Sequence, residues 1–141
     1  MSSVGSSNTL SETGFVLDSF ALLALLGAEK GSGDVAALLR PGPDLLLMTY
    51  VNLGEVVYTV IRERGPSRAD AALLALEGSR ITFVPADRTL TLAAARLKAD
   101  HRLSYADAFC AALSQLSGFP VVTGDPEFLQ LDGLISIRWV G

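Results

Sequence analysis

Short apolar runs alternate along this chain with longer segments in which apolar residues recur at helical spacing. The short runs predict strands and the longer segments predict helices. The predicted strands are Phe15–Leu17, Asp44–Met48, Ile81–Val84, Val121–Thr123 and Ile135–Val140. The predicted helices are Ser19–Leu26, Tyr50–Arg64, Thr89–Lys98, Ser104–Ser117 and a short one from Pro126. Because strands separated by helices pair in parallel, we expect an α/β fold, a three-layer α/β/α domain with a central, mostly parallel sheet.

Glycine and proline mark the boundaries between these elements. Pro41-Gly-Pro43 and Gly65-Pro66 are breakers, and we expect Ser67 to cap a helix that runs to Glu77. Residues 1–13 are rich in Ser, Gly, Asn and Thr and hold almost no apolar side chains. We therefore expect them to form a disordered tail outside the folded domain.

The composition is that of a single globular domain. The chain has 141 residues, half of them hydrophobic and only 18% charged, which suits one domain of ~150 residues with a substantial core. Its longest apolar run, Phe20 to Ala28, is far shorter than the ~18 residues of a membrane span. The single cysteine, Cys110, cannot form an internal disulfide, which fits a reducing cytoplasm.

The overall charge is unfavourable for binding nucleic acid. Eleven basic residues against fifteen acidic ones leave a net charge of -4, so an RNA or DNA partner requires a local compensating charge, such as a bound divalent cation. The one basic cluster is Arg62, Arg64 and Arg68. These arginines either complement the end of a helix or follow an RNA backbone.

Two acidic residues come soon after predicted strands. Asp18 is the only charge between Gly14 and Ala28, and Asp125 follows Val121–Thr123 and precedes a proline. Each fits the N-cap of the following helix. Each also lies beyond the carboxyl end of a predicted parallel strand, where open α/β sheets bind their ligands.

Two further acids stand alone on apolar helices. Glu55 is the only charge from Met48 to Ile61, and Asp107 is in a similarly apolar segment. Glu55 could lie on a solvent-exposed face, and Asp107 could interact with the helix dipole. Alternatively, these carboxylates converge with the first two in one pocket, where they would raise one another's pKa unless a divalent cation keeps them ionised.

Four sequence blocks carry a resemblance to a known family. They are FVLDSFALLALL (15–26), VNLGEV (51–56), LSYADA (103–108) and VVTGD (121–125). In this order they resemble a PIN domain, and in particular the small ribonuclease toxins of VapBC-type toxin–antitoxin pairs. The resemblance extends from Phe15 to Val140, so we expect residues 14–141 to form one PIN domain.

The resemblance implies a Mg²⁺- or Mn²⁺-dependent endoribonuclease that cleaves RNA with a metal-activated water and leaves 5′-phosphate and 3′-hydroxyl ends. The residues that match the family's catalytic and metal-binding acids are Asp18, Glu55, Asp107 and Asp125. It also suggests Thr123 as a supporting polar group. One departure from the family pattern is Phe20, which stands where the family commonly has Ser or Asn.

The residue chemistry agrees with a site for a hard cation. Mg²⁺ prefers carboxylate and water oxygens. His101 is the only histidine and Cys110 the only cysteine, so the chain cannot build a Cys/His zinc site. Without a histidine or cysteine arrangement for nucleophilic catalysis, water activated by a metal is the natural nucleophile.

The resemblance also implies partners. The family suggests a cognate antitoxin, received by a groove of helices near Leu22–Leu26, and a homodimer; no membrane association is expected. An RNA-processing nuclease without an antitoxin, a DNA nuclease and a non-catalytic interaction module are alternatives with the same fold. The presence of all four acids argues against the last of these. A phosphoacceptor receiver domain requires a lysine after a late strand, and neither Lys30 nor Lys98 follows a predicted strand.

Overall fold

The computed structural model describes residues 12–141, so the tail predicted over residues 1–13 lies outside the described residues except for its last two. The elements, in chain order, are β1 (Gly14–Leu17), α2 (Ser19–Leu26), α3 (Ser32–Leu39), β2 (Leu45–Thr49), α4 (Tyr50–Arg64), α5 (Pro66–Glu77), β3 (Thr82–Val84), α6 (Arg88–Asp100), α7 (Tyr105–Ser117), β4 (Val121–Thr123), the 3₁₀ helix η1 (Pro126–Leu131) and β5 (Ile137–Trp139).

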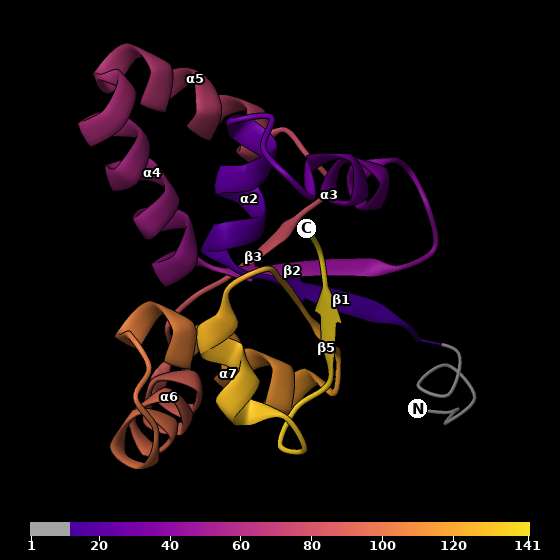
Figure 1. The fold of residues 1–141 in the computed structure, drawn as a ribbon, viewed down its shortest axis with the longest axis vertical. Coiled ribbons are helices and arrows are strands. Elements are labelled where there is room, and N and C mark those ends of the chain that lie inside the picture. The colour runs from indigo at the N-terminus through magenta and orange to yellow at the C-terminus, as the bar shows by residue number, and fades with distance from the viewer. Residues whose placement is uncertain (1–11) are drawn as a thin grey trace.

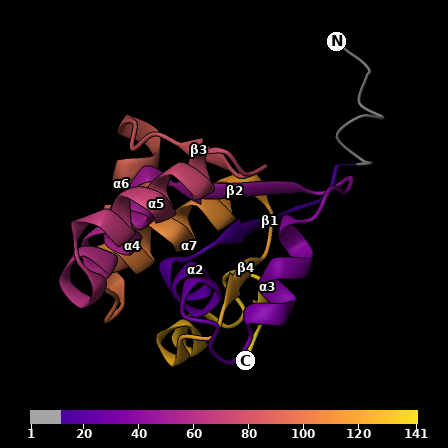
Figure 2. The ribbon, with the colours of Figure 1, turned by 90° about the horizontal axis from the view of Figure 1, so that it is seen from above.

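The five strands form one sheet in the order β3-β2-β1-β4-β5, and every neighbouring pair is parallel. Figure 2 shows β3, β2, β1 and β4 in this order. The chain starts in the middle of the sheet, builds one half through β2 and β3, and then crosses to the other side of β1 for β4 and β5. The space beyond the carboxyl ends of β1 and β4 is therefore the point where the strand order reverses, which is where open α/β sheets bind ligands.

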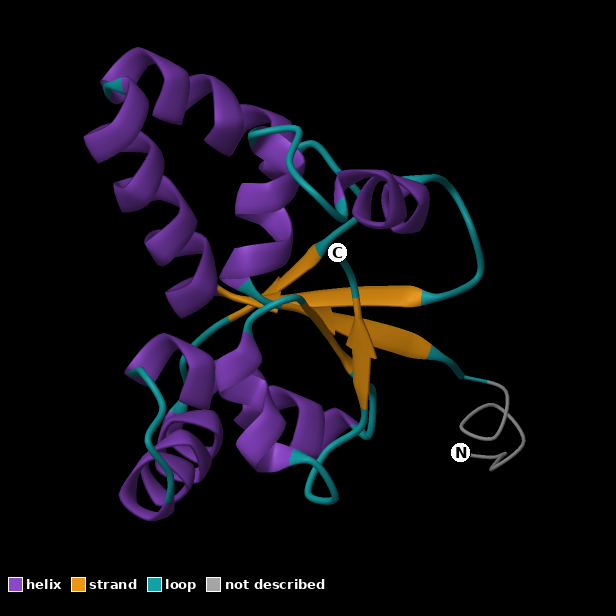
Figure 3. Ribbon diagram, in the orientation of Figure 1, coloured by secondary structure: helices purple, strands orange, loops and turns teal. Residues whose placement is uncertain are grey.

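Helices cover both faces of the sheet, which confirms the predicted three-layer architecture (Figures 1 and 3). Successive strand residues point to opposite faces. Val16 and Val121 therefore pack with α6 and α7, whereas Leu17 and Val122 pack with α2, α3, α4 and α5. The two cores fix β1 and β4 from both sides, so the loops that follow these strands begin from a rigid base.

Two local predictions differ from the structure. Helix α3 was not predicted, because its segment is short, contains Gly33 and follows an N-cap glycine, Gly31, and buries only Val35. Ser67 does not cap α5; the helix begins at Pro66 and its N-cap is Gly65, with φ 90° and no side-chain cap hydrogen bond. Proline at the first helical position supplies the required φ by itself. Within residues 12–141, no helix combines the length and apolar character needed to cross a membrane.

Candidate metal centre

The four acids predicted from the sequence are brought together where β1 and β4 end. Asp18 directly follows β1, and Asp125 lies just beyond β4. Asp107 is in the first turn of α7 and Glu55 is in the second turn of α4. Figure 1 shows that these two helices begin close to the carboxyl ends of the central strands. Strands and helices from both halves of the chain therefore contribute to one site.

Asp18 is fully buried, and its two carboxylate oxygens have different surroundings. Oδ1 accepts a 2.8 Å hydrogen bond from the Ala21 amide, which makes Asp18 the N-cap of α2. Oδ2 is buried with no hydrogen-bond partner among the described residues. Burial raises the pKa of Asp18 to about 7; the Thr123 side chain and the Ala21 amide lower it, and the charges of Asp125 and Glu55 raise it further. The structure thus leaves one carboxylate oxygen of Asp18 buried and unpaired.

Asp107 is also buried and interacts with several acids. Its backbone amide donates a 3.1 Å hydrogen bond to Oγ of Ser104, the N-cap of α7. Burial raises the pKa of Asp107 to about 8, and a side-chain hydrogen bond with Glu127 and the charges of Asp125, Asp18 and Glu127 add to this effect. A carboxyl group with this pKa is mainly protonated at neutral pH unless a cation offsets the surrounding negative charge.

Glu127 is a member of the site that the sequence reading missed. One carboxylate oxygen each from Asp107, Asp125 and Glu127 lie within 4.8 Å of one another. Asp125 Oδ1 accepts a 2.9 Å hydrogen bond from the Glu127 amide and caps η1. An acid in the first turn of a helix is explained by the helix dipole alone, so the only available signal was its position two residues after Asp125.

Glu55 and Thr123 complete the cluster. Glu55 is half-buried, and its charge raises the pKa of Asp18. Thr123 is fully buried; its Oγ1 accepts a 2.9 Å hydrogen bond from the Asp125 amide, and its side chain favours the ionised form of Asp18. Burial, followed by the charges of Asp18, Asp107 and Glu55, raises the pKa of the Cys110 thiol. Cys110 therefore lies beneath the acids as a neutral, buried group.

A buried hydrogen-bond network holds the helices that carry three of the acids. The Asn52 Nδ2 donates 3.1 Å hydrogen bonds to Ser19 Oγ and to the Ala106 carbonyl, and its Oδ1 accepts from the Thr49 hydroxyl. The Ser19 hydroxyl donates back to the Asn52 carbonyl at 3.2 Å. These bonds join α2, α4 and α7 at the residues next to Asp18 and Asp107. Sequence analysis did not single out Asn52, although a fully buried amide must find such partners.

These residues fit a divalent cation. The oxygens of Asp107, Asp125 and Glu127 form a hard, negatively charged donor set, which is the kind that Mg²⁺ and Mn²⁺ prefer. Asp18 and Glu55 lie outside this close group, although Asp18 interacts with its acids through charge. A cation would also compensate the desolvation and mutual repulsion that raise the pKa values of Asp18 and Asp107.

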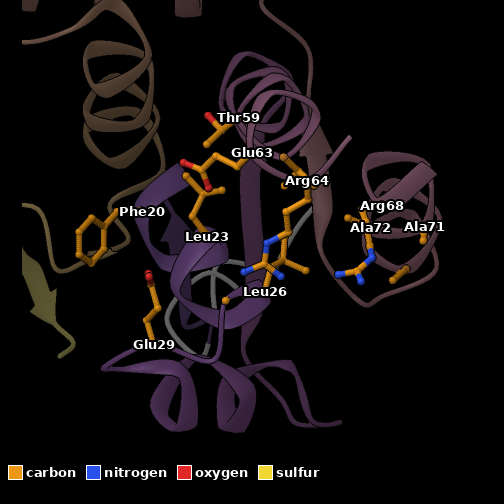
Figure 4. Close-up of a pocket in the computed structure, with 13 residues that line it drawn as sticks. Phe20, Leu23, Leu26, Glu29, Thr59, Glu63, Arg64, Arg68, Ala71 and Ala72 are labelled. Carbon is orange, nitrogen blue, oxygen red and sulfur yellow. The ribbon is translucent and has the colours of Figure 1, made fainter. Parts of the chain in front are cut away.

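A groove of about 520 Å³ lies between α2, α4 and α5. Figure 4 shows Phe20, Leu23 and Leu26 along α2, and the Arg64 and Arg68 side chains on the facing helices. Arg64 and Arg68, two of the three arginines of the basic cluster, thus line the groove. Arg62 and Arg64 both lie in the last turn of α4. The groove combines an apolar wall with two guanidinium groups and the two carboxylates of Glu29 and Glu63.

Comparison with known proteins identifies the family. The model of the PIN domain matches residues 15–134. The chain belongs to the PIN domain family. The family prediction is therefore confirmed, and the acids described above lie at the carboxyl edge of a PIN-domain sheet. A search of curated proteins found no match to this sequence.

Solved structures show the same fold in VapC toxins. Mycobacterium tuberculosis VapC20, described as a sarcin-ricin loop cleaving toxin, aligns with TM-score 0.70 and 18% identity over 82% of this chain and 93% of that one. The DNA-bound VapBC of Salmonella typhimurium aligns with TM-score 0.70 and 18% identity over 90% and 98%. M. tuberculosis VapBC-5 aligns with TM-score 0.61 and 22% identity over 91% and 98%. At these identities the likeness concerns the fold.

Proposed function

We propose that this PIN domain is a divalent-metal-dependent endoribonuclease and the toxin of a VapBC-type toxin–antitoxin pair. The observation that carries the proposal is the fully buried Asp18, whose Oδ2 has no partner within the described part of the chain and whose charge interacts with Glu55, Asp107 and Asp125. An orphaned buried carboxylate oxygen is costly, and its presence among three other acids is best explained by a cation.

Each acid has a role in this proposal. Asp18, Glu55, Asp107 and Asp125 hold Mg²⁺ or Mn²⁺. Thr123 lowers the pKa of Asp18 and accepts a hydrogen bond from the Asp125 amide. When bound, the cation would supply an activated water and neutralise the scissile phosphate. The protein contributes a fixed set of carboxylates. Asp18 and Asp125 are the N-caps of α2 and η1, and the Asp107 amide is bound by Ser104, the N-cap of α7. Such a set costs little reorganisation during the reaction.

The α2/α4/α5 groove supports an antitoxin partner. Two of the solved relatives are VapBC complexes by their descriptions. The apolar wall of the groove, which is flanked by Arg64, Arg68, Glu29 and Glu63, suits a partner segment that presents apolar side chains with charges of both signs beside them. We place the protein in the cytoplasm, as the single cysteine suggests, and as a homodimer, on the family expectation alone.

The nuclease is tested with purified protein that carries no antitoxin. A pool of structured cellular RNAs is incubated with Mg²⁺, with Mn²⁺ and with EDTA, and a matched DNA pool distinguishes the substrate class. We expect discrete cuts in RNA that need the metal and that disappear in Asp18→Asn and Asp107→Asn. Asp100→Asn, which changes an exposed acid at the end of α6, is the matched control and should cleave normally. Intact RNA under all conditions, or equal cleavage by the Asp18 and Asp107 variants, would refute the proposal.

The toxin role requires a second measurement. Expression of the protein alone should arrest growth, and co-expression of the neighbouring small gene product should relieve the arrest and bind the protein. Metal-dependent cleavage without toxicity and without such binding would assign the chain to RNA processing instead.

A further inference from the structure

Phe20 is exposed on a helix whose neighbouring residues are buried. Its side chain is 40% exposed, whereas Ser19, Ala21 and Leu22 on either side are 3% exposed or less. A large aromatic side chain that is left partly in water contributes less to the core than its size allows. The position of this ring is therefore not explained by packing alone.

The fold makes room for the ring beside the metal centre. A Cβ added to Gly124 would lie 2.5 Å from Cε1 and 3.1 Å from Cζ of Phe20, and 2.7 Å from the Val140 carbonyl oxygen. The edge of the ring thus occupies space that any side chain at position 124 would need. Gly124 is the residue between Thr123 and Asp125, so the ring touches the loop that joins two members of the proposed site.

RNA at this site needs an attraction that does not depend on bulk charge. The chain has a net charge of -4, and the acids repel phosphates that are not neutralised by the cation. The basic cluster is remote along α4: from Glu55 to Arg64 the helix rises ~13 Å. Stacking of a base on an aromatic ring is worth ~1–3 kcal/mol per base and needs no positive charge.

We propose that Phe20 is a stacking platform for an unpaired RNA base next to the scissile phosphate. The proposal rests on the proposed function, because it assumes that the acids beside Gly124 receive a phosphodiester. It names the preferred substrate as RNA with unstacked bases, in loops or single strands, since only such bases present a free face to a side chain. Phe20 is thereby a specificity-determining residue.

The proposal is tested by measuring RNA affinity after removal of the Phe20 ring, of single RNA bases, and of both together. The probe is a fluorescent single-stranded oligoribonucleotide of mixed sequence, together with a series in which one position at a time is abasic. Binding is measured by anisotropy in the Asp18→Asn background, which prevents cleavage, at a concentration of Mg²⁺ raised until binding no longer changes, because this variant holds the cation less tightly. At one position, removal of the base should weaken binding by ~5- to 150-fold, the affinity equivalent of ~1–3 kcal/mol.

Addition of Phe20→Ala to this background should abolish the dependence on that base, and Phe20→Trp should keep it. Phe20→Leu, which retains apolar volume without a ring, should behave like Phe20→Ala. Leu116→Ala is the matched control, because Leu116 is a 53% exposed apolar side chain in the last turn of α7. This variant should leave the effect of each abasic position on binding unchanged. Thermal melts establish that each variant is folded.

Several outcomes would overturn the proposal. An equal dependence on the base with and without the ring, or no dependence at any position, rules out stacking on Phe20. Phe20 also lines the groove; if Phe20→Ala weakened antitoxin binding and left the RNA profile intact, the ring would belong to the groove. The cleavage assay separates the two proposals. If the protein cuts RNA but its binding does not depend on any single base, only the stacking role of Phe20 is refuted. If binding depends on a base but no RNA is cut, only the nuclease is refuted.

Discussion

Ser19 and Asn52 are joined by reciprocal hydrogen bonds: the Asn52 amide donates to Ser19 Oγ at 3.1 Å, and the Ser19 hydroxyl donates to the Asn52 carbonyl at 3.2 Å. Both residues are buried. The pair fixes the start of α2 against the start of α4, and so fixes Asp18 relative to Glu55. Positioning of the two acids therefore depends on side chains that do not themselves belong to the acid cluster.

Ser19→Ala should reduce both stability and cleavage. The substitution removes both hydrogen bonds and leaves the buried Asn52 amide with only the Ala106 carbonyl, which should cost ~1–3 kcal/mol of unfolding free energy. Urea denaturation measures this loss. Ser67→Ala is the control, because Ser67 is exposed and makes no cap hydrogen bond. An equal loss of unfolding free energy in Ser67→Ala would show that the hydrogen bonds of Ser19 do not stabilise the fold.

Asp18→Asn should stabilise the metal-free protein, and more so at higher pH. The pKa of Asp18 in the folded protein is raised from 3.8 to about 7, so the folded state favours the protonated carboxyl group. The stability that this protonation provides is fully present below pH 4 and is lost as the pH rises to about 7. Asparagine carries no charge and can still accept the Ala21 hydrogen bond. In EDTA, the difference in Tm between variant and wild type should therefore grow from pH 5 to pH 8. A constant difference would contradict the assigned pKa.

Mg²⁺ should raise the Tm of the wild type at pH 8 and have much less effect on Asp18→Asn. A ligand present at a hundred times its Kd stabilises the folded state by ~2.7 kcal/mol, which is a shift of several degrees for a domain of this size. At pH 5 the effect should fall, because protons compete for Asp18 and Asp107. Titration of Mg²⁺ by differential scanning fluorimetry at both pH values checks this, and removal by EDTA should reverse it.

Glu127→Gln should shift the acid limb of the cleavage profile to lower pH. The hydrogen bond and charge of Glu127 raise the pKa of Asp107, so removal of this charge lets Asp107 ionise at lower pH. Single-turnover cleavage rates between pH 5 and pH 9 provide the profile. Glu77→Gln, at an exposed position at the end of α5, should have no such effect; an unchanged profile in both variants would remove Glu127 from the site.

Two glycine substitutions should have opposite effects on stability. Gly124→Ala places a Cβ 2.7 Å from the Val140 carbonyl oxygen, which is backbone and cannot move aside, so we expect a loss of ~1–3 kcal/mol. Gly54→Ala meets no atom within 4 Å and lies within α4, so it should gain ~0.5–1 kcal/mol. Both are measured by urea denaturation. Equal effects would show that the close approach at Gly124 does not constrain the loop.

The fold was predictable because its local signals agree with one another. The predicted bounds of α2, α4 and β4 are those observed, since apolar periodicity, caps and breakers coincide there. Helix α3 lacked these signals: it buries one side chain and has no side-chain cap. Its position is determined by packing against α2 and the sheet, which a local pattern does not contain.

The candidate site was predictable as a set of acids but not as a geometry. For Asp18, the cap and the metal ligand were competing interpretations, yet the structure gives one carboxylate oxygen to the cap and leaves the other without a partner. The cap is therefore confirmed, and the role of Asp18 as a metal ligand stays a prediction that the cap does not exclude. Glu127 and Asn52 were missed because their importance comes from contacts with Asp107 and Ser19, which are distant in the sequence.

The central position of β1 determines when the proposed enzyme comes into existence during synthesis. β1 pairs with β2 on one side and with β4 on the other, so Asp18 is synthesised 107 residues before Asp125 and meets it only after β4 has been made. A nascent chain that ends before β4 can build half of the sheet without the fourth acid. In the proposed nuclease the acid cluster is complete only once β4 and Asp125 are in place, so a product that ends before β4 should lack cleavage activity.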